Sequence, residues 1–336
     1  MSRRLNVYIY APVALLTLLA GTANAQSASL NGPIAGFVFN GTSKTVRPML
    51  GIPGATRIDV PVLSRVEAAS IAPGGKWAFI TRARRSTFMH GLSDLAPTES
   101  SVSGLIDAVD RVVWSRDGSF AVLYSSSGNQ FQRVQFPGSL PVADGPVDLS
   151  PWGQVTALAV DPAGQQIAVG FATQGLYLFT AGQSPALLSS MAQPVAAAFD
   201  GTGHSLFAVD LATQRIVQFQ STGGSADFVS LAQTDGPTLQ PAGLAVSGDG
   251  HYLLLADSAT RSVLVYATDS RSLANTLPLS FAPSRFEALS ADPVFLLNGN
   301  DPKEWLLVLD ARQVPVVYFV PASLPANSPA TAEARQ

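Results

Sequence analysis

Residues 242–255 read AGLAVSGDGHYLLL, which is a strand of small apolar residues, a tight turn and a second strand of bulkier apolar residues. This unit recurs along the chain, and the third turn residue is glycine in each copy, at intervals of 39 to 47 residues. A recurrent glycine at this point predicts a hairpin residue with positive φ, where a Cβ atom would clash. The five glycines are Gly75, Gly118, Gly164, Gly203 and Gly250.

The copies continue into a third apolar strand, such as 262–266, and a weaker fourth strand, such as 275–279, which contains Pro278. Proline is tolerated on an edge strand, where no ladder donor is needed. Four strands in about 40 to 45 residues are typical of a β-propeller blade. The strand of small residues before each turn fits next to the propeller axis, where the blades crowd together. The sequence therefore predicts an all-β propeller of four-stranded blades.

The number of blades follows from the number of inner-strand candidates. A sixth, divergent unit extends from Arg285 to Val320, and a hairpin at 34–39 and 45–50 precedes the first full unit. Six inner-strand candidates favour six blades, and seven is the alternative. We expect the hairpin to close the ring by packing in the same blade as the C-terminal strands, because free ends would leave unpaired sheet edges.

The two ends of the chain differ in composition from the repeats. Arg3 and Arg4, an apolar run at 11–21 and the small residues Ala23-Asn24-Ala25 predict a signal peptide over 1–25, cleaved after Ala25. A retained membrane anchor is the alternative, but the run is shorter than the roughly 20 residues of a membrane span. We expect a periplasmic or secreted protein with a single propeller domain over 26–320. The tail, 321–336, is rich in Ala, Pro and Ser and is expected to be disordered.

Composition excludes several classes of protein. The chain has no cysteine, so it has no disulfide and no thiolate metal site. Loss of the two arginines of the signal peptide changes the formal charge from -3 to -5, which argues against nucleic acid as a partner. Charged residues make up 13% of the chain and hydrophobic residues 47%, as expected for strands that are buried on both faces. We expect a monomer with no stable membrane span after cleavage.

Three of the repeats resemble known groups of blades. Residues 210–219 (DLATQRIVQF) and 257–266 (DSATRSVLVY) resemble NHL-repeat blades, whereas 160–164 (VDPAG) and 246–250 (VSGDG) resemble the YVTN-type and WD-like blades of bacterial secreted propellers. The resemblance covers most of 34–320, and the repeats lack the Trp-Asp ending of true WD repeats. It implies a propeller fold but no single function, because such propellers include binding scaffolds, lactonases and oxidoreductases.

Residues that carry chemistry are sparse. The chain has three histidines, no G-x-S-x-G nucleophile elbow, no H-E-x-x-H motif and no EF-hand loop. We therefore predict no catalytic residue, no resident metal and no cofactor. Asp210 and Asp257 recur at one repeat position, where they could ligate a metal, as acidic residues do at the mouth of propeller lactonases. The alternative is that each carboxylate caps its local turn.

The turns between the second and third strands share one face of the predicted disc, because strands within a blade run antiparallel. Their residues vary in length and charge from blade to blade, which suits recognition on a rigid scaffold. We predict a non-catalytic scaffold that binds a protein, peptide or glycan there. The alternatives are a propeller enzyme (a metal-dependent lactonase or hydrolase, or a cofactor-dependent dehydrogenase) and a stabilising subunit of an envelope complex. The candidate partner-binding residues are Arg82, Arg84, Arg85, Asp210, Arg215, Asp257 and Arg261.

Overall fold

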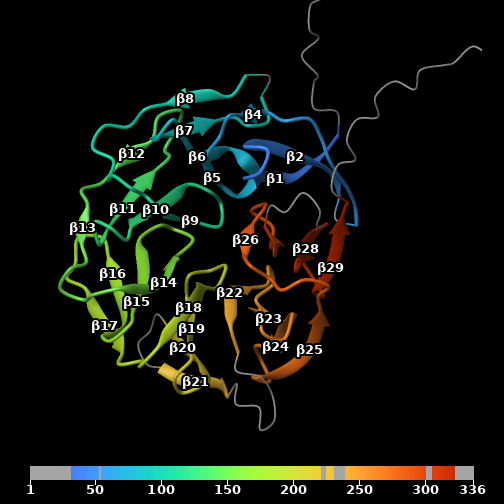
Figure 1. Cartoon of the computed structure of the whole chain (residues 1–336). Coiled ribbons are helices and arrows are strands. Elements are labelled where there is room, and N and C mark those ends of the chain that lie inside the picture. Colours follow the sequence, from blue (N-terminus) through green and yellow to red (C-terminus); the bar gives the residue numbers. More distant parts are fainter. Residues whose placement is uncertain are drawn as a thin grey trace, which may run out of the picture.

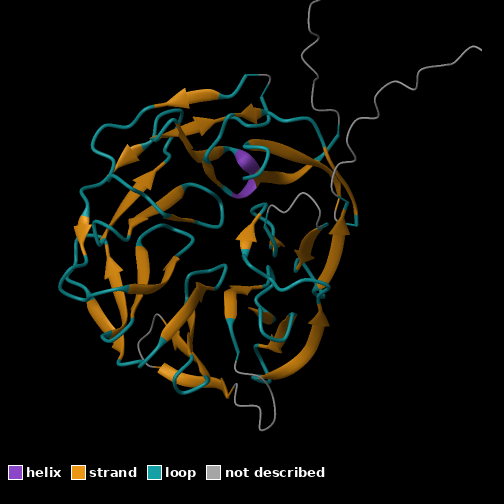
Figure 2. Ribbon diagram, viewed as in Figure 1, coloured by secondary structure: helices purple, strands orange, loops and turns teal. Residues whose placement is uncertain are grey.

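Strands account for nearly all the regular structure of the chain, as the repeat pattern predicts (Figure 2). A computed structural model describes residues 32–52, 54–94, 96–220, 225–230, 239–299 and 305–321. Within these ranges, 29 strands form seven sheets that surround a central axis as the blades of a propeller (Figure 1). The one stretch of helix among the described residues is a 3₁₀ turn, η1 (Pro73–Gly75).

The blades are numbered in chain order. Blade 1 contains β1 (Ile34–Asn40), β2 (Thr45–Ile52), β3 (Ala55–Ile58) and β4 (Leu63–Ser64). Blade 2 contains β5 (Ala68–Ile71), β6 (Trp77–Arg82), β7 (Arg85–His90) and β8 (Thr98–Ser100). Blade 3 contains β9 (Arg111–Trp114), β10 (Phe120–Ser125), β11 (Gln130–Gln135), β12 (Val142–Ala143) and β13 (Val147–Asp148). Blade 4 contains β14 (Val155–Val160), β15 (Gln166–Phe171), β16 (Gly175–Thr180) and β17 (Ala186–Ser189).

The remaining blades have the same layout. Blade 5 contains β18 (Pro194–Phe199), β19 (Ser205–Asp210), β20 (Arg215–Gln220) and β21 (Ser225–Ser230). Blade 6 contains β22 (Pro241–Val246), β23 (Tyr252–Asp257), β24 (Ser262–Ala267) and β25 (Ser272–Pro278). Blade 7 contains β26 (Glu287–Ala288), β27 (Val294–Leu296), β28 (Leu306–Asp310) and β29 (Val316–Val320).

The turn glycines have the predicted backbone conformation. All five third-position glycines adopt φ between 65° and 76°, the left-handed region that a side chain disfavours. They lie in the turns between the inner strand and the second strand of blades 2 to 6, on what we call the first-turn face of the disc. Because neighbouring strands are antiparallel, the turns between second and third strands lie on the opposite side, which we call the second-turn face.

Blade 1 begins at the second-strand position. Its β3 and β4 both pair with β2, just as β12 and β13 of blade 3 both pair with the third strand, β11. Lys44 has φ 53° just before β2, as Asn129 has φ 43° just before β11. The carbonyl oxygen of Lys44 accepts the N–H of Val66 at 2.9 Å, as that of Asn129 accepts the N–H of Leu149 at 2.8 Å. Thus β1 and β2 correspond to the second and third strands, and the described part of blade 1 has no inner strand.

This arrangement explains the blade count. The sequence does contain six inner strands, so counting them favours six blades, whereas the structure has the alternative number, seven. The expectation that the N-terminal hairpin shares a blade with the C-terminal strands is wrong. The hairpin β1–β2 belongs to blade 1, and blade 7 takes all four of its strands from residues 287–320.

The ring is closed by side chains packed between blades. Seven clusters of buried apolar residues each join two neighbouring blades. The cluster between the last blade and the first brings Val38 and Met49 against Leu296, Val308 and Val320. Backbone contacts reinforce this closure, because the N–H of Gly74 in blade 2 donates to the carbonyl oxygen of Leu289 in blade 7 at 3.0 Å.

The signal peptide and the C-terminal tail that the sequence predicts lie at the two ends of the chain. The expected signal peptide, 1–25, lies outside the described residues, as does the expected tail, 321–336, apart from Pro321. Among the helices of the described chain, none has the length and apolar character needed to cross a membrane.

Candidate functional site

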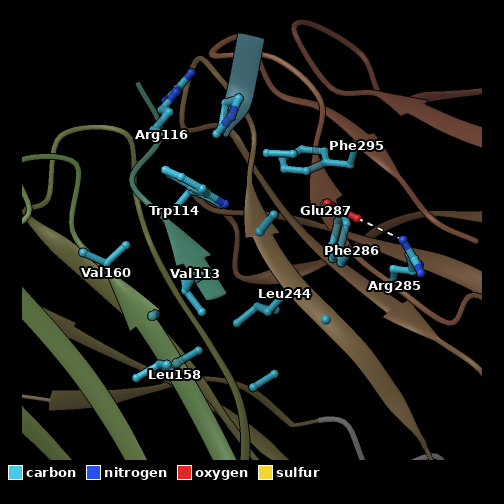
Figure 3. Close-up of a pocket in the computed structure, with 18 of the residues that line it drawn as sticks. Val113, Trp114, Arg116, Leu158, Val160, Leu244, Arg285, Phe286, Glu287 and Phe295 are labelled. Carbon is cyan, nitrogen blue, oxygen red and sulfur yellow. Dashed lines mark hydrogen bonds and ion pairs between the residues drawn. The ribbon is translucent and has the colours of Figure 1, made fainter. Parts of the chain in front are cut away.

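A cavity of about 840 Å³ occupies the centre of the ring (Figure 3). It is lined by the inner strands of blades 2 to 7, which are β5, β9, β14, β18, β22 and β26. Small residues such as Ala69, Ala197 and Ala245 leave this space open between the strands. The prediction that the small-residue strand lies next to the axis is therefore confirmed.

Blades 7 and 2 meet at the channel wall, where blade 1 has no described inner strand. The Glu287 carboxylate accepts a hydrogen bond from the backbone N–H of Ile71 and a second from Nη1 of Arg285 at 3.2 Å. Burial among the inner strands raises the pKa of Glu287, and the charge and hydrogen bond of Arg285 act in the opposite direction. The pair therefore places one carboxylate and one guanidinium on the channel wall (Figure 3).

The first-turn mouth of the channel is crossed by one long side chain. Arg116, in the first turn of blade 3, donates from Nε to the carbonyl oxygen of Ala291 in blade 7 at 3.1 Å. A Cβ atom added to Gly201 of blade 5 would lie 2.0 Å from Nη1 of Arg116. One added to Gly248 of blade 6 would lie 3.3 Å from Nη2. The guanidinium of blade 3 thus lies against the turns on the far side of the ring.

The second-turn face carries the arginines that the sequence singles out. The tips of the second-to-third-strand hairpins expose Arg84, Arg85, Arg215 and Arg261. Arg82 is half-buried beside this cluster, and its Nε is buried without a hydrogen-bond partner. Arg84 has φ 63°, so its position in a tight turn fixes the direction in which its side chain leaves the hairpin.

The two aspartates of the candidate set have a different environment. Asp210 is 4% exposed and accepts the N–H of Gln193 at 3.0 Å and the hydroxyl of Thr213 at 3.0 Å. Asp257 is fully buried and accepts the N–H of Gln240 at 2.5 Å and that of Thr260 at 2.9 Å. Both carboxylates cap their own turns, which is the alternative that the sequence left open. Neither offers surface to a partner.

We expect Asp257→Asn to lower the free energy of unfolding by about 1–3 kcal/mol, because an amide presents an acceptor to one side of the turn only and leaves a buried N–H unpaired. Urea unfolding monitored by circular dichroism measures the change. Asp269→Asn is the matched control, since its carboxylate is 88% exposed. Equal stability of the two variants would contradict the capping role of Asp257.

Sequence reasoning missed two basic residues that the fold brings to the same face. Lys44 and Arg65 are exposed and have positive φ, at 53° and 58°. They lie close together, because the carbonyl oxygen of Lys44 bonds the residue that follows Arg65. With Arg84 and Arg85 on blade 2 they form what we call the basic turn surface. Only recognition of β1–β2 as a second-to-third-strand hairpin would have placed Lys44 here.

The three histidines lie in three different blades. His204 and His251 are exposed in first turns, whereas the ring of His90 packs at 4.6 Å from the ring of Trp77. Among the described residues, no group of three or more His, Asp or Glu side chains could hold a metal ion.

Comparison with known proteins shows the fold and not a family. No family model matches the chain, and no curated protein matches its sequence. A protein from Lactobacillus plantarum is similar in structure, with a TM-score of 0.61 at 12% identity over 85% of this chain and 96% of that chain. A protein of unknown function from Desulfotomaculum acetoxidans has a TM-score of 0.56 at 12% identity, over 86% of this chain and 99% of that one.

A third similar structure is a catalytically inactive virginiamycin B lyase from Staphylococcus aureus, solved with quinupristin. Its TM-score is 0.54 at 14% identity, over 76% of this chain and 84% of the lyase chain. At such low identities these similarities establish a β-propeller. They do not distinguish NHL, YVTN or WD-like repeats.

Proposed function

We propose that the protein is a non-catalytic binding scaffold of the cell envelope, whose second-turn face receives a protein, peptide or glycan that carries carboxylates. The observation that carries this proposal is a difference in burial between the acidic and the basic side chains in the hairpins of that face. Asp210 and Asp257 are buried in turn caps, while the arginines of the same hairpins are exposed. The hairpin tips therefore present guanidinium groups, whose planar fork matches a carboxylate.

The channel rim carries charges of both signs. Asp110 and Arg111 are both exposed, and the Asp110 carboxylate accepts the backbone N–H of Ser126 at 2.8 Å and also its hydroxyl. Exposed acidic groups on this side include Glu67, whose carboxylate accepts the backbone N–H of Arg84 at 3.2 Å. The bond to Glu67 uses the backbone of Arg84 and leaves its guanidinium free to bind a ligand.

A periplasmic or secreted location follows from the signal peptide expected over 1–25, and the NHL-like and YVTN-like repeats agree with a scaffold of that kind. The blades form a rigid scaffold, and the hairpin residues on its second-turn face differ in size and charge from blade to blade. In this proposal the exposed arginines of the hairpins bind the carboxylates of the partner.

We expect the double substitution Arg84→Glu, Arg85→Glu to weaken binding of an immobilised oligoglutamate peptide or oligogalacturonate by about 1–3 kcal/mol, roughly 5- to 150-fold. Biolayer interferometry at fixed ionic strength measures the affinities. Exposed turn charges contribute little to folding, so the thermal midpoint should not change.

Arg271→Glu provides the control for charge alone. Arg271 is exposed and has φ 51° in a tight turn, but this turn joins β24 to β25 on the first-turn face. Its substitution should leave the affinity nearly unchanged. An equal loss with Arg271→Glu, or no loss with the double variant, would remove the basic turn surface from the binding site.

A further inference from the structure

The six first turns that surround the channel differ at one position in a way that their own geometry does not explain. This position is the residue that begins each turn, next to the mouth. Five of the turns have a short or compact residue there, and blade 3 has an arginine. The residues, from blade 2 to blade 7, are Pro73, Arg116, Pro162, Gly201, Gly248 and Ser290.

The glycines at 201 and 248 are not required by the backbone. Neither adopts positive φ, unlike Gly203 and Gly250 of the same turns. At Gly201 an added Cβ would lie 2.0 Å from Nη1 of Arg116. At Gly248 it would lie 2.9 Å from Cγ of Pro293 and 3.3 Å from Nη2 of Arg116. The absence of a side chain at Gly201 therefore makes room for Arg116, and its absence at Gly248 makes room for Pro293 and Arg116 together.

Three far-side turns hold the guanidinium in place. Nε donates to the carbonyl oxygen of Ala291 at 3.1 Å, and the two Nη atoms lie over Gly201 and Gly248. Among the described residues these three turns belong to blades 7, 5 and 6, whereas Arg116 itself belongs to blade 3. The side chain of Arg116 consequently spans the mouth.

We propose that Arg116 closes the first-turn mouth, so that the central channel is a one-ended binding cavity loaded from the second-turn face. A cavity of about 840 Å³ falls in the size range of sites for small organic molecules, about 300–1,000 Å³. The closed end would exclude a ligand that threads through the ring. This inference concerns access to the channel and does not depend on the basic turn surface.

The absence of cysteine allows access to be measured with single introduced thiols. Ala245→Cys places a thiol on the channel wall one residue from the end of β22, near the first-turn mouth. Ala69→Cys places one near the start of β5, at the opposite mouth. The neutral reagent N-ethylmaleimide then reports how easily each end is reached, because thiol reaction rates depend on access.

We expect Arg116→Ala to accelerate labelling of the thiol at 245 by about fivefold or more and to leave labelling at 69 unchanged. Loss of a nearby cation would raise the pKa of the thiol and slow the reaction, so an acceleration reports an opened mouth. Gly201→Ala should give the same acceleration, because its Cβ would occupy the place of Nη1 while the charge of Arg116 remains.

Gly138→Ala is the matched control, since Gly138 is exposed and an added Cβ would meet nothing within 4 Å. Circular dichroism checks that every variant is folded. Unchanged labelling at 245 in both Arg116→Ala and Gly201→Ala would overturn the proposal. An equal acceleration at 69 would also overturn it, because it would indicate general loosening of the ring. Neither result bears on carboxylate binding at the basic turn surface.

Discussion

Replacement of Trp77 with alanine is expected to lower the free energy of unfolding by about 3–5 kcal/mol. Trp77 is completely buried between blades 2 and 3, where its ring lies 4.8 Å from that of Phe136 and 4.6 Å from that of His90. Truncation to alanine would leave a cavity that the surrounding strands, held by their ladders, cannot fill. Urea unfolding followed by circular dichroism measures the loss.

Trp305 provides the matched control, since its side chain is 53% exposed on blade 7. Trp305→Ala should change the free energy of unfolding by less than about 1 kcal/mol. Trp77→Phe should cost less than Trp77→Ala, because it keeps most of the ring volume and removes an indole N–H that is buried without a partner. A similar small effect for both alanine variants would show that the interface between blades 2 and 3 does not limit stability.

Gly164→Ala is expected to have an effect of similar size, about 1–2 kcal/mol from left-handed backbone strain and about 1–3 kcal/mol from overpacking. Gly164 has φ 65°, and a Cβ added there would lie 2.2 Å from Cγ of the Phe120 ring in the preceding blade. The guanidinium of Arg133 also lies 5.9 Å from the centroid of this half-buried ring. Arg133 is itself fixed by bonds to the carbonyl oxygen of Gly164 at 2.8 Å and to Asp144 at 2.6 Å.

Gly250→Ala separates the two contributions. Gly250 has the same turn position and φ 76°, but an added Cβ would meet nothing within 4 Å. Its substitution should therefore cost only the backbone strain, about 1–2 kcal/mol. Chemical denaturation of the two variants measures the difference. If both lose the same stability, the contact between Phe120 and the turn of blade 4 contributes nothing beyond conformation.

The sequence predicted the parts of the fold that repeat. The turn glycines and the small-residue inner strands could be found because each recurs at a regular interval and has a local cause, positive φ or crowding at the axis. The favoured count of six omitted blade 1, which lacks both the inner strand and the glycine turn among its described residues, and the alternative count of seven is the one found. A count of inner strands cannot register a blade that has none.

The candidate site could be predicted only in part, because side-chain exposure depends on packing. The hairpin position of Asp257 and Arg261 was recognised from the repeat, yet one is buried and the other exposed. Arg116 reads in sequence as an ordinary turn residue. Its contact with Ala291 joins residues 175 positions apart and follows from the closure of the ring, which a local pattern does not encode.

The packing between blades 7 and 1 sets the character of the seam in this ring. The seam is the interface between blade 7 and blade 1. No sheet in the described chain takes strands from both of these blades, so side-chain packing joins them and a shared β-ladder does not. Its resistance to opening comes mainly from apolar contacts such as those of Val38 and Val308. Apolar contacts weaken on cooling, whereas a shared strand would have added a ladder of hydrogen bonds. The hold of this seam, like that of the other interfaces between blades, therefore weakens on cooling.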